Sequence, residues 1–190
     1  MTFAEGALLE PLSVVMHGIE RARLSLGRGA VICGAGPIGL IALAAARASG
    51  AHPLCITDLD PSRLEFAKSY VPSCQTYLID RDLNAMQNAQ EIRKAFGQGE
   101  YAAPRTVRGL VKKSPVHVSS DVFQILECTG AESSVETAAY TVRRGGLILV
   151  IGVGRPTFNL PFMHMSLAEI DLQFINRVSF THSVSILHEG

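Results

Sequence analysis

Short apolar runs alternate with amphipathic stretches along most of the chain, and this alternation predicts strands and helices in turn. The apolar runs predict strands at 30–33, about 53–57, more weakly 76–79, then 121–128, 147–151 and 171–175. Apolar residues at every third or fourth position, or helix-favouring composition, predict helices at about 11–26, 37–49, 61–70, 84–96 and 133–142. Such alternation indicates parallel βαβ units with right-handed crossovers. We therefore expect an α/β fold with a doubly wound, six-stranded parallel sheet.

One stretch, residues 97–120, breaks this pattern. It contains glycines, prolines and cations with little periodicity, which predicts an exposed insertion. The remaining chain is long enough for one well-cored domain, since 190 residues with 47% hydrophobic positions support one core rather than two large ones.

Charge and targeting signals narrow the function classes. The 17 basic and 17 acidic residues cancel, which leaves no electrostatic footprint for nucleic acid or an anionic membrane. The uncharged stretch 29–46 contains Pro37 and several glycines and is shorter than the ~20 residues of a membrane span. The first residues carry an acid and no apolar core with a cleavage site, so we expect a cytoplasmic protein.

Cysteines and histidines give no self-contained catalytic centre. The four cysteines lie far apart without a C-x-x-C pair, which argues against a zinc knuckle or a disulfide scaffold and predicts small core residues. The six histidines are scattered and form no H-E-x-x-H motif. The sequence also lacks a Y-x-x-x-K pair and a G-x-S-x-G nucleophile elbow.

A glycine run follows the first predicted strand and opens the next predicted helix. It reads Gly34-Ala35-Gly36-Pro37-Ile38-Gly39, a G-x-G-x-x-G pattern. In this context Gly34 makes the tight turn, Gly36 admits a pyrophosphate and Gly39 lets helix and strand pack closely. The helix amino terminus supplies free N–H groups and a positive dipole end. The run therefore predicts a dinucleotide site.

An acid about twenty residues further on supports this prediction. Asp58 ends the second predicted strand, where a carboxylate accepts hydrogen bonds from both adenosine ribose hydroxyls and repels the extra phosphate of NADP. Arg63 lies near and could hold that phosphate instead, but Asp58 is closer to the strand end. We therefore expect NAD rather than NADP.

Two further strand ends lie on the same predicted edge of the sheet. Thr129-Gly130 follows the fourth predicted strand, and Ile151-Gly152-Val153 ends the fifth. Ligands lie at the carboxyl ends of strands in open parallel sheets. These residues are therefore weaker candidates for the same site, with ordinary turn chemistry as the alternative.

Four segments together carry a family resemblance. They are 6–14 (GALLEPLSV), 33–39 (CGAGPIG), Thr57-Asp58 with Arg63, and 127–134 (ECTGAESS). In combination they resemble the medium-chain, zinc-dependent polyol dehydrogenases of the sorbitol, xylitol and L-arabinitol 4-dehydrogenase type. The resemblance extends from about Phe3 to Arg177 and identifies the coenzyme-binding domain, which has a Rossmann fold.

The resemblance implies hydride transfer to NAD from a secondary alcohol of a sugar alcohol, which becomes a ketose while zinc polarises the alcohol. It implies that Glu10 lies at the zinc, directly or through its water, although the pattern alone makes Glu10 a helix-start residue. It implies that Arg177 faces the substrate. The residues implied to contact NAD are Ile38, Asp58, Arg63, Ile151, Gly152, Val153, Ile175, Asn176 and Arg177.

The chain also departs from this family. The catalytic domain with most zinc ligands, which the family places before Phe3 and completes after Gly190, is missing, and Val178 stands where the family has tyrosine. We expect 1–27 to be a leading segment and helix from the catalytic-domain junction, 28–177 the coenzyme domain and 178–190 a truncated tail. Zinc is then expected only in a longer chain, and the 190 residues alone should be inactive.

Two alternatives stay open. One is a non-enzymatic NAD-binding module, an inactive truncated paralogue. The other is a zinc-independent reductase of the same superfamily, against which Asp58 argues because such reductases use NADP. The family resemblance further implies a homo-oligomer formed through the edge strand at 172–175.

Overall fold

Six parallel strands form one sheet in the computed structural model, which describes residues 2–24, 26–97 and 122–175. The strand order is β3-β2-β1-β4-β5-β6. The strands are β1 (Ala30–Cys33), β2 (Leu54–Asp58), β3 (Gln75–Leu78), β4 (Gln124–Glu127), β5 (Leu147–Val150) and β6 (Asp171–Phe174). The expected doubly wound, six-stranded parallel sheet is confirmed. Because the order reverses at β1, the ends of β1 and β4 mark the topological switch point, where ligands bind in this architecture.

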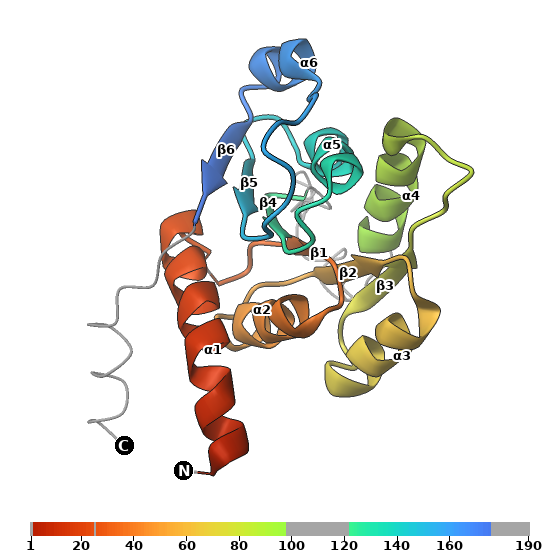
Figure 1. The fold of residues 1–190 in the computed structure, drawn as a ribbon. Helices are drawn as coiled ribbons and strands as arrows, with labels where there is room; N and C mark the ends of the chain where they lie inside the picture. The colour runs from red at the N-terminus through yellow and green to blue at the C-terminus, as the bar shows by residue number, and fades with distance from the viewer. Residues whose placement is uncertain (1, 25, 98–121, 176–190) are drawn as a thin grey trace, which may run out of the picture.

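Helices cover both faces of the sheet (Figure 1). The helices α1 (Phe3–Ala22), α2 (Pro37–Ala48) and α3 (Pro61–Tyr70) pack on one face. On the other face lie α4 (Ala85–Gly97), α5 (Glu132–Thr141) and the short α6 (Phe162–Leu167). The sheet therefore separates two hydrophobic cores.

Alternate residues of each central strand enter opposite cores. In β1, Ile32 belongs to the core under α1, α2 and α3, whereas Val31 belongs to the core under α4 and α5. In β4, Leu126 and Ile125 divide in the same way. All four side chains are fully buried. This explains why the strands lack polar alternation in the sequence.

The first helix differs from the prediction, which had it begin at Pro11. In the structure α1 begins at Phe3 and has Pro11 in its interior. Proline costs the helix one backbone hydrogen bond, but the buried Val15 and Ile19 anchor α1 in the core, and tertiary packing outweighs the local preference. The helix ends at Ala22 rather than near residue 26 because Arg23 adopts a left-handed conformation with φ of +49°.

Three other differences are local. The short helix α6 was not predicted, since its six residues are too few to show a helical period. In the described part of the chain β4 starts at Gln124, whereas the prediction extended it from 121 to 128. Gly97 belongs to α4 rather than to the predicted insertion, and residues 98–120 of that insertion lie outside the described residues. No described helix combines the length and hydropathy that a membrane crossing requires.

Candidate cofactor-binding site

The glycine run forms the turn between β1 and the amino terminus of α2. Gly34 has φ of +97°, in the left-handed region that glycine tolerates. A Cβ at Gly39 would lie 1.8 Å from the Gly34 carbonyl oxygen, so only glycine allows the helix to pack this closely on the turn. A Cβ at Gly36 would meet no atom within 4 Å, so this position faces open space. The tight turn expected at Gly34 and the close packing expected at Gly39 are present in this geometry, and the pyrophosphate role of Gly36 stays a prediction.

The amino terminus of α2 is open towards that space. Its N-cap residue is Gly36, which has no side chain to cap the helix, and Pro37 follows at the first helical positions. Ile38 lies half-buried in the first turn and packs against the core. An uncapped helix amino terminus is suited to an anion such as a pyrophosphate.

Asp58 ends β2 and lies against the glycine turn. Its Oδ2 accepts a hydrogen bond of 2.6 Å from the backbone N–H of Ala35, and its Oδ1 accepts one of 2.9 Å from the N–H of Asp60. Each carboxylate oxygen can accept more than one hydrogen bond. The carboxylate is therefore oriented by the backbone and still has acceptor capacity for ribose hydroxyls.

Arg63 lies next to this acid on α3. Its Nη1 is 4.0 Å from Asp58 Oδ2, and its Nε is 3.8 Å from Asp60 Oδ2. The Arg63 side chain is 58% exposed, so these ion pairs are weak. Hydrogen bonds from the hydroxyl and N–H of Ser62, with a smaller contribution from Arg63, lower the pKa of Asp60. Arg63 thus borders the site as a partner of two acids.

These residues border a groove of about 710 Å³, within the usual size range of small-molecule sites. Its walls come from the glycine turn, the end of β2, the loop between β3 and α4, and the start of α5. The lining includes Gly34, Asp58, Arg63, Asp80, Arg81, Asn84, Asn88, Thr129 and Ser133. The structure therefore brings the predicted adenosine-side residues together around one cavity.

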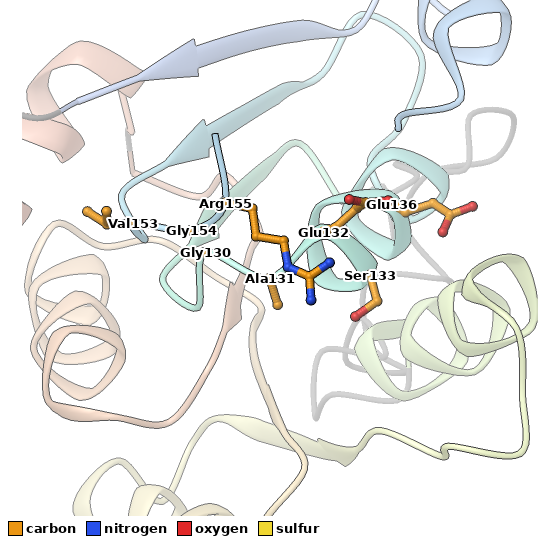
Figure 2. Close-up of a pocket in the computed structure, with 8 residues that line it drawn as sticks. All are labelled: Gly130, Ala131, Glu132, Ser133, Glu136, Val153, Gly154 and Arg155. Carbon is orange, nitrogen blue, oxygen red and sulfur yellow. The ribbon is translucent and has the colours of Figure 1, made fainter. Parts of the chain in front are cut away.

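A second pair of turns lies at the ends of β4 and β5. A Cβ at Gly152 would lie 2.1 Å from the Gly130 nitrogen, and a Cβ at Gly154 would lie 1.8 Å from the Gly130 oxygen. The two turns therefore pack backbone against backbone. A pocket of about 640 Å³ lies at this place. Figure 2 shows Val153 and Gly154 beside Gly130 in its lining, with the Arg155 side chain extending along it. The turns predicted as weaker candidates are thus direct neighbours.

Glu127 is the functional candidate that the sequence prediction missed. It is fully buried at the end of β4, and its carboxylate accepts hydrogen bonds from Thr129, Gly130 and Ser134. A buried carboxylate needs such partners to offset its desolvation. The signal was available in the sequence as an acid directly after the apolar pair Ile125-Leu126, and only the family motif included it.

Two thiols lie near this carboxylate, the buried Cys33 and the half-buried Cys128. Burial, and secondarily the charge of Glu127, raises the pKa of Cys33 to about 12. The same two causes raise the pKa of Cys128. The described cysteines are free thiols, and the predicted core role of Cys33, Cys55 and Cys74 is confirmed by their burial. Thiols with such raised pKa values are poor nucleophiles.

Several predicted residues lie away from the groove. Glu10 is exposed in the interior of α1, so its interpretation as a helix-start residue is wrong, and no residue of α1 lines either pocket. Ile175, directly after β6, is buried against α1, where a Cβ at Gly18 would lie 2.9 Å from its Cδ1 atom. Asn176 and Arg177 lie outside the described residues. Within residues 2–24, 26–97 and 122–175, no three His, Cys, Asp or Glu side chains are placed to hold a metal ion.

Known proteins are similar to this chain in sequence and in fold. The chain is 48% identical over 174 residues to L-arabinitol 4-dehydrogenase of Aspergillus niger, covering 92% of this chain and 42% of that protein. It is 34% identical to sorbitol dehydrogenase of Mus musculus, covering 98% of this chain and 45% of that protein. Galactitol-1-phosphate dehydrogenase from Escherichia coli has the same fold, with a TM-score of 0.70 at 22% identity over 100% of this chain and 51% of that one.

A family model also matches most of the chain. The model described as zinc-binding dehydrogenase matches residues 37–188, which include Gly39 at the end of the glycine run, Asp58 and both strand-end turns. The chain spans less than half the length of the two dehydrogenase sequences above. On the extent of this match, the chain belongs to the zinc-binding dehydrogenase family.

Proposed function

We propose that this chain binds NAD(H) as the coenzyme-binding domain of a zinc-dependent polyol dehydrogenase. One observation carries the proposal: the Asp58 carboxylate is oriented at the end of β2, directly against the glycine turn and in a groove of about 710 Å³. The similarity to L-arabinitol and sorbitol dehydrogenases supports a sugar alcohol as the substrate. It also favours this function over a non-enzymatic NAD-binding module.

The residues of this chain would bind and orient the cofactor. NAD supplies the hydride acceptor when bound. The ribose hydroxyls would donate to Asp58, and the pyrophosphate would lie at the open amino terminus of α2 beside Gly36. The nicotinamide half would extend across the switch point towards Thr129 and Gly152. Ile38, Ile151 and Val153 would border the cofactor along this path.

NAD is proposed over NADP on the basis of charge. A 2′-phosphate would approach the Asp58 carboxylate and be repelled. Arg63, the cation that could favour the phosphate, lies within 4.0 Å of both Asp58 and Asp60 and is partly neutralised by them. One solved structure of similar fold, a zinc-binding dehydrogenase from Sinorhizobium meliloti, is described as bound to NADP, at 20% identity and a TM-score of 0.68.

The catalytic half of the proposal concerns a longer chain. There, Glu10 would lie at the zinc, Arg177 would face the polyol, and Ile175 and Asn176 would contact NAD. The described residues of this chain do not by themselves assemble a metal site. The proposal also includes a cytoplasmic location and a homo-oligomer formed through the edge strand β6.

Binding measurements on the 190-residue chain test the cofactor assignment. Isothermal titration should give tighter binding of NADH than of NADPH. Asp58→Ala should weaken NADH about 10- to 150-fold, since a charge-assisted hydrogen bond contributes about 1.5–3 kcal/mol. The same variant should lose less NADPH affinity than NADH affinity, because the repulsive charge is gone.

The ratio of NADH affinity to NADPH affinity distinguishes loss of ribose recognition from disruption of the glycine turn. Asp58→Ala also removes the hydrogen bond to Ala35 N, which would weaken both cofactors equally if it were the whole effect. Asp171→Asn, at an exposed acid on the edge strand, is the matched charge control and should leave both affinities unchanged. An unchanged NADH to NADPH ratio in Asp58→Ala would refute the ribose assignment.

A further inference from the structure

We infer that Glu127 is a positioning residue that fixes the two turns facing the nicotinamide half of the cofactor. The inference rests on the proposed NAD(H) binding and assigns a task to a residue that touches no ligand. Glu127 has 0% exposure, so it acts only through the groups that it binds.

The side chain organises the turn after β4. Its Oε1 accepts hydrogen bonds from Thr129 N and Ser134 Oγ, both at 2.9 Å, and from the Thr129 hydroxyl. Its Oε2 accepts one of 3.0 Å from Gly130 N. One carboxylate therefore fixes the backbone of Thr129 and Gly130 and ties both to the first turn of α5.

The main chain of the same residue organises the turn after β5. The Glu127 carbonyl oxygen accepts hydrogen bonds from Ile151 N at 2.8 Å and from Gly152 N at 2.9 Å. Gly152 in turn packs on Gly130 so closely that a Cβ would lie 2.1 Å from the Gly130 nitrogen. A shift of the first turn therefore displaces the second, because the contact leaves no space between the backbones.

A carboxylate suits this position and an amide does not. The Glu127 side chain accepts in every one of its hydrogen bonds in the described structure. Glutamine of the same size would offer one accepting oxygen and one N–H₂ group, which would face a donor instead of accepting from it. Glu127→Gln therefore leaves buried N–H or O–H groups unsatisfied and moves the turns without creating a cavity.

These turns lie on the nicotinamide side of the site. In the proposed binding mode, Asp58 at the end of β2 binds the adenosine ribose, and the glycine turn after β1 binds the pyrophosphate. A dinucleotide that crosses the switch point continues past β1 to the ends of β4 and β5. Because Thr129 also lines the groove beside Asp58, Glu127 should affect ligands that contain nicotinamide more strongly than ADP-ribose rather than exclusively.

The experiment compares NADH with ADP-ribose, which lacks the nicotinamide ring. Both are titrated calorimetrically into the wild-type 190-residue chain and into Glu127→Gln. NADH affinity should fall about fivefold or more, while ADP-ribose affinity should fall by a smaller factor. Glu20→Gln, at an exposed acid on α1, is the matched control and should change neither.

A milder variant tests the same role in case Glu127→Gln prevents folding. Ser134→Ala removes one donor to the carboxylate and should produce a smaller loss of NADH affinity in the same direction. Equal weakening of NADH and ADP-ribose in both variants would overturn the positioning role, since a merely structural residue affects both ligands. Equal wild-type affinity for the two ligands would also overturn it. A wild-type chain that binds neither ligand would refute the proposed function itself.

Discussion

Replacing Asn88 should loosen the loop between β3 and α4, which forms the outer wall of the groove beside Asp58. The Asn88 side chain is buried, with 3% exposure, and both ends of its amide are used. Its oxygen accepts from the Tyr77 hydroxyl at 2.9 Å and from Asp80 N at 3.0 Å. Its nitrogen donates to the carbonyl oxygens of Asp80, Leu83 and Asn84 at 2.9, 3.1 and 3.3 Å. One side chain therefore holds the loop between β3 and α4 to the first turn of α4.

The magnitude follows from these hydrogen bonds, in which the two amide protons of Asn88 are shared among three carbonyl oxygens. Each is worth about 1 kcal/mol net, but Asp80 and Asn84 are exposed and regain water when Asn88 is removed. We therefore expect Asn88→Ala to lower the free energy of unfolding by about 2–3 kcal/mol rather than by the full sum. For a chain of this size the melting temperature should fall by about 4–10 °C.

Asn88→Asp adds a pH signature to the same test. The acid keeps the two accepted hydrogen bonds but would place a carboxylate against three carbonyl oxygens, which raises its pKa above the unfolded value of about 3.9. Above that pH the unfolded chain releases a proton that the folded chain retains, so the stability of the variant falls as pH rises towards the folded pKa. Its deficit relative to the wild type should thus be larger at pH 7 than at pH 4.5.

Calorimetric melting at both pH values, together with ADP-ribose titration, measures these effects. Both Asn88 variants should weaken ADP-ribose, because the loop residues Asp80, Arg81 and Asn84 line the groove. Gln90→Glu, at an exposed amide on the same helix, is the control and should change neither stability nor binding. A melting temperature within about 1 °C of the wild type for Asn88→Ala would refute this reasoning.

Two further predictions concern the glycine turn and the thiols. Gly39→Ala places a Cβ 1.8 Å from the Gly34 oxygen and should lower both the melting temperature and NADH affinity, whereas Gly36→Ala meets nothing within 4 Å and should weaken NADH alone; equal melting temperatures for the two variants would contradict the packing argument. Because burial raises the pKa of Cys33 to about 12 and also raises that of Cys55, folded protein at pH 8 should protect both thiols from a disulfide reagent, and fast labelling of either would contradict their burial.

The fold could be predicted because its signals are local. Apolar runs and helical periods recur in turn, and the handedness of crossovers then leaves few topologies. The adenosine side of the candidate cofactor site could be predicted for the same reason, since the spacing from Gly34 to Asp58 follows from one βαβ unit. Failures arose where tertiary packing outweighed a local rule, as at Pro11 inside α1.

The rest of the site depends on contacts between distant segments. Gly130 and Gly152 are individually ordinary turn glycines, and only the sheet brings their backbones together. The hydrogen bonds of Glu127 and Asn88 likewise depend on how a turn folds back on its strand or helix. Periodicity and motif spacing carry no information about such contacts.

The hydrogen bond between Ala35 N and Asp58 Oδ2 couples the choice of cofactor to the stability of the glycine turn. A designer who exchanges Asp58 for a small neutral residue to admit NADP also releases the glycine turn from the end of β2. Such a redesign should begin with a substitute acceptor for the Ala35 N–H, for example a serine or asparagine at position 58. Cofactor exchange in this chain is therefore a problem of loop stability as well as of charge.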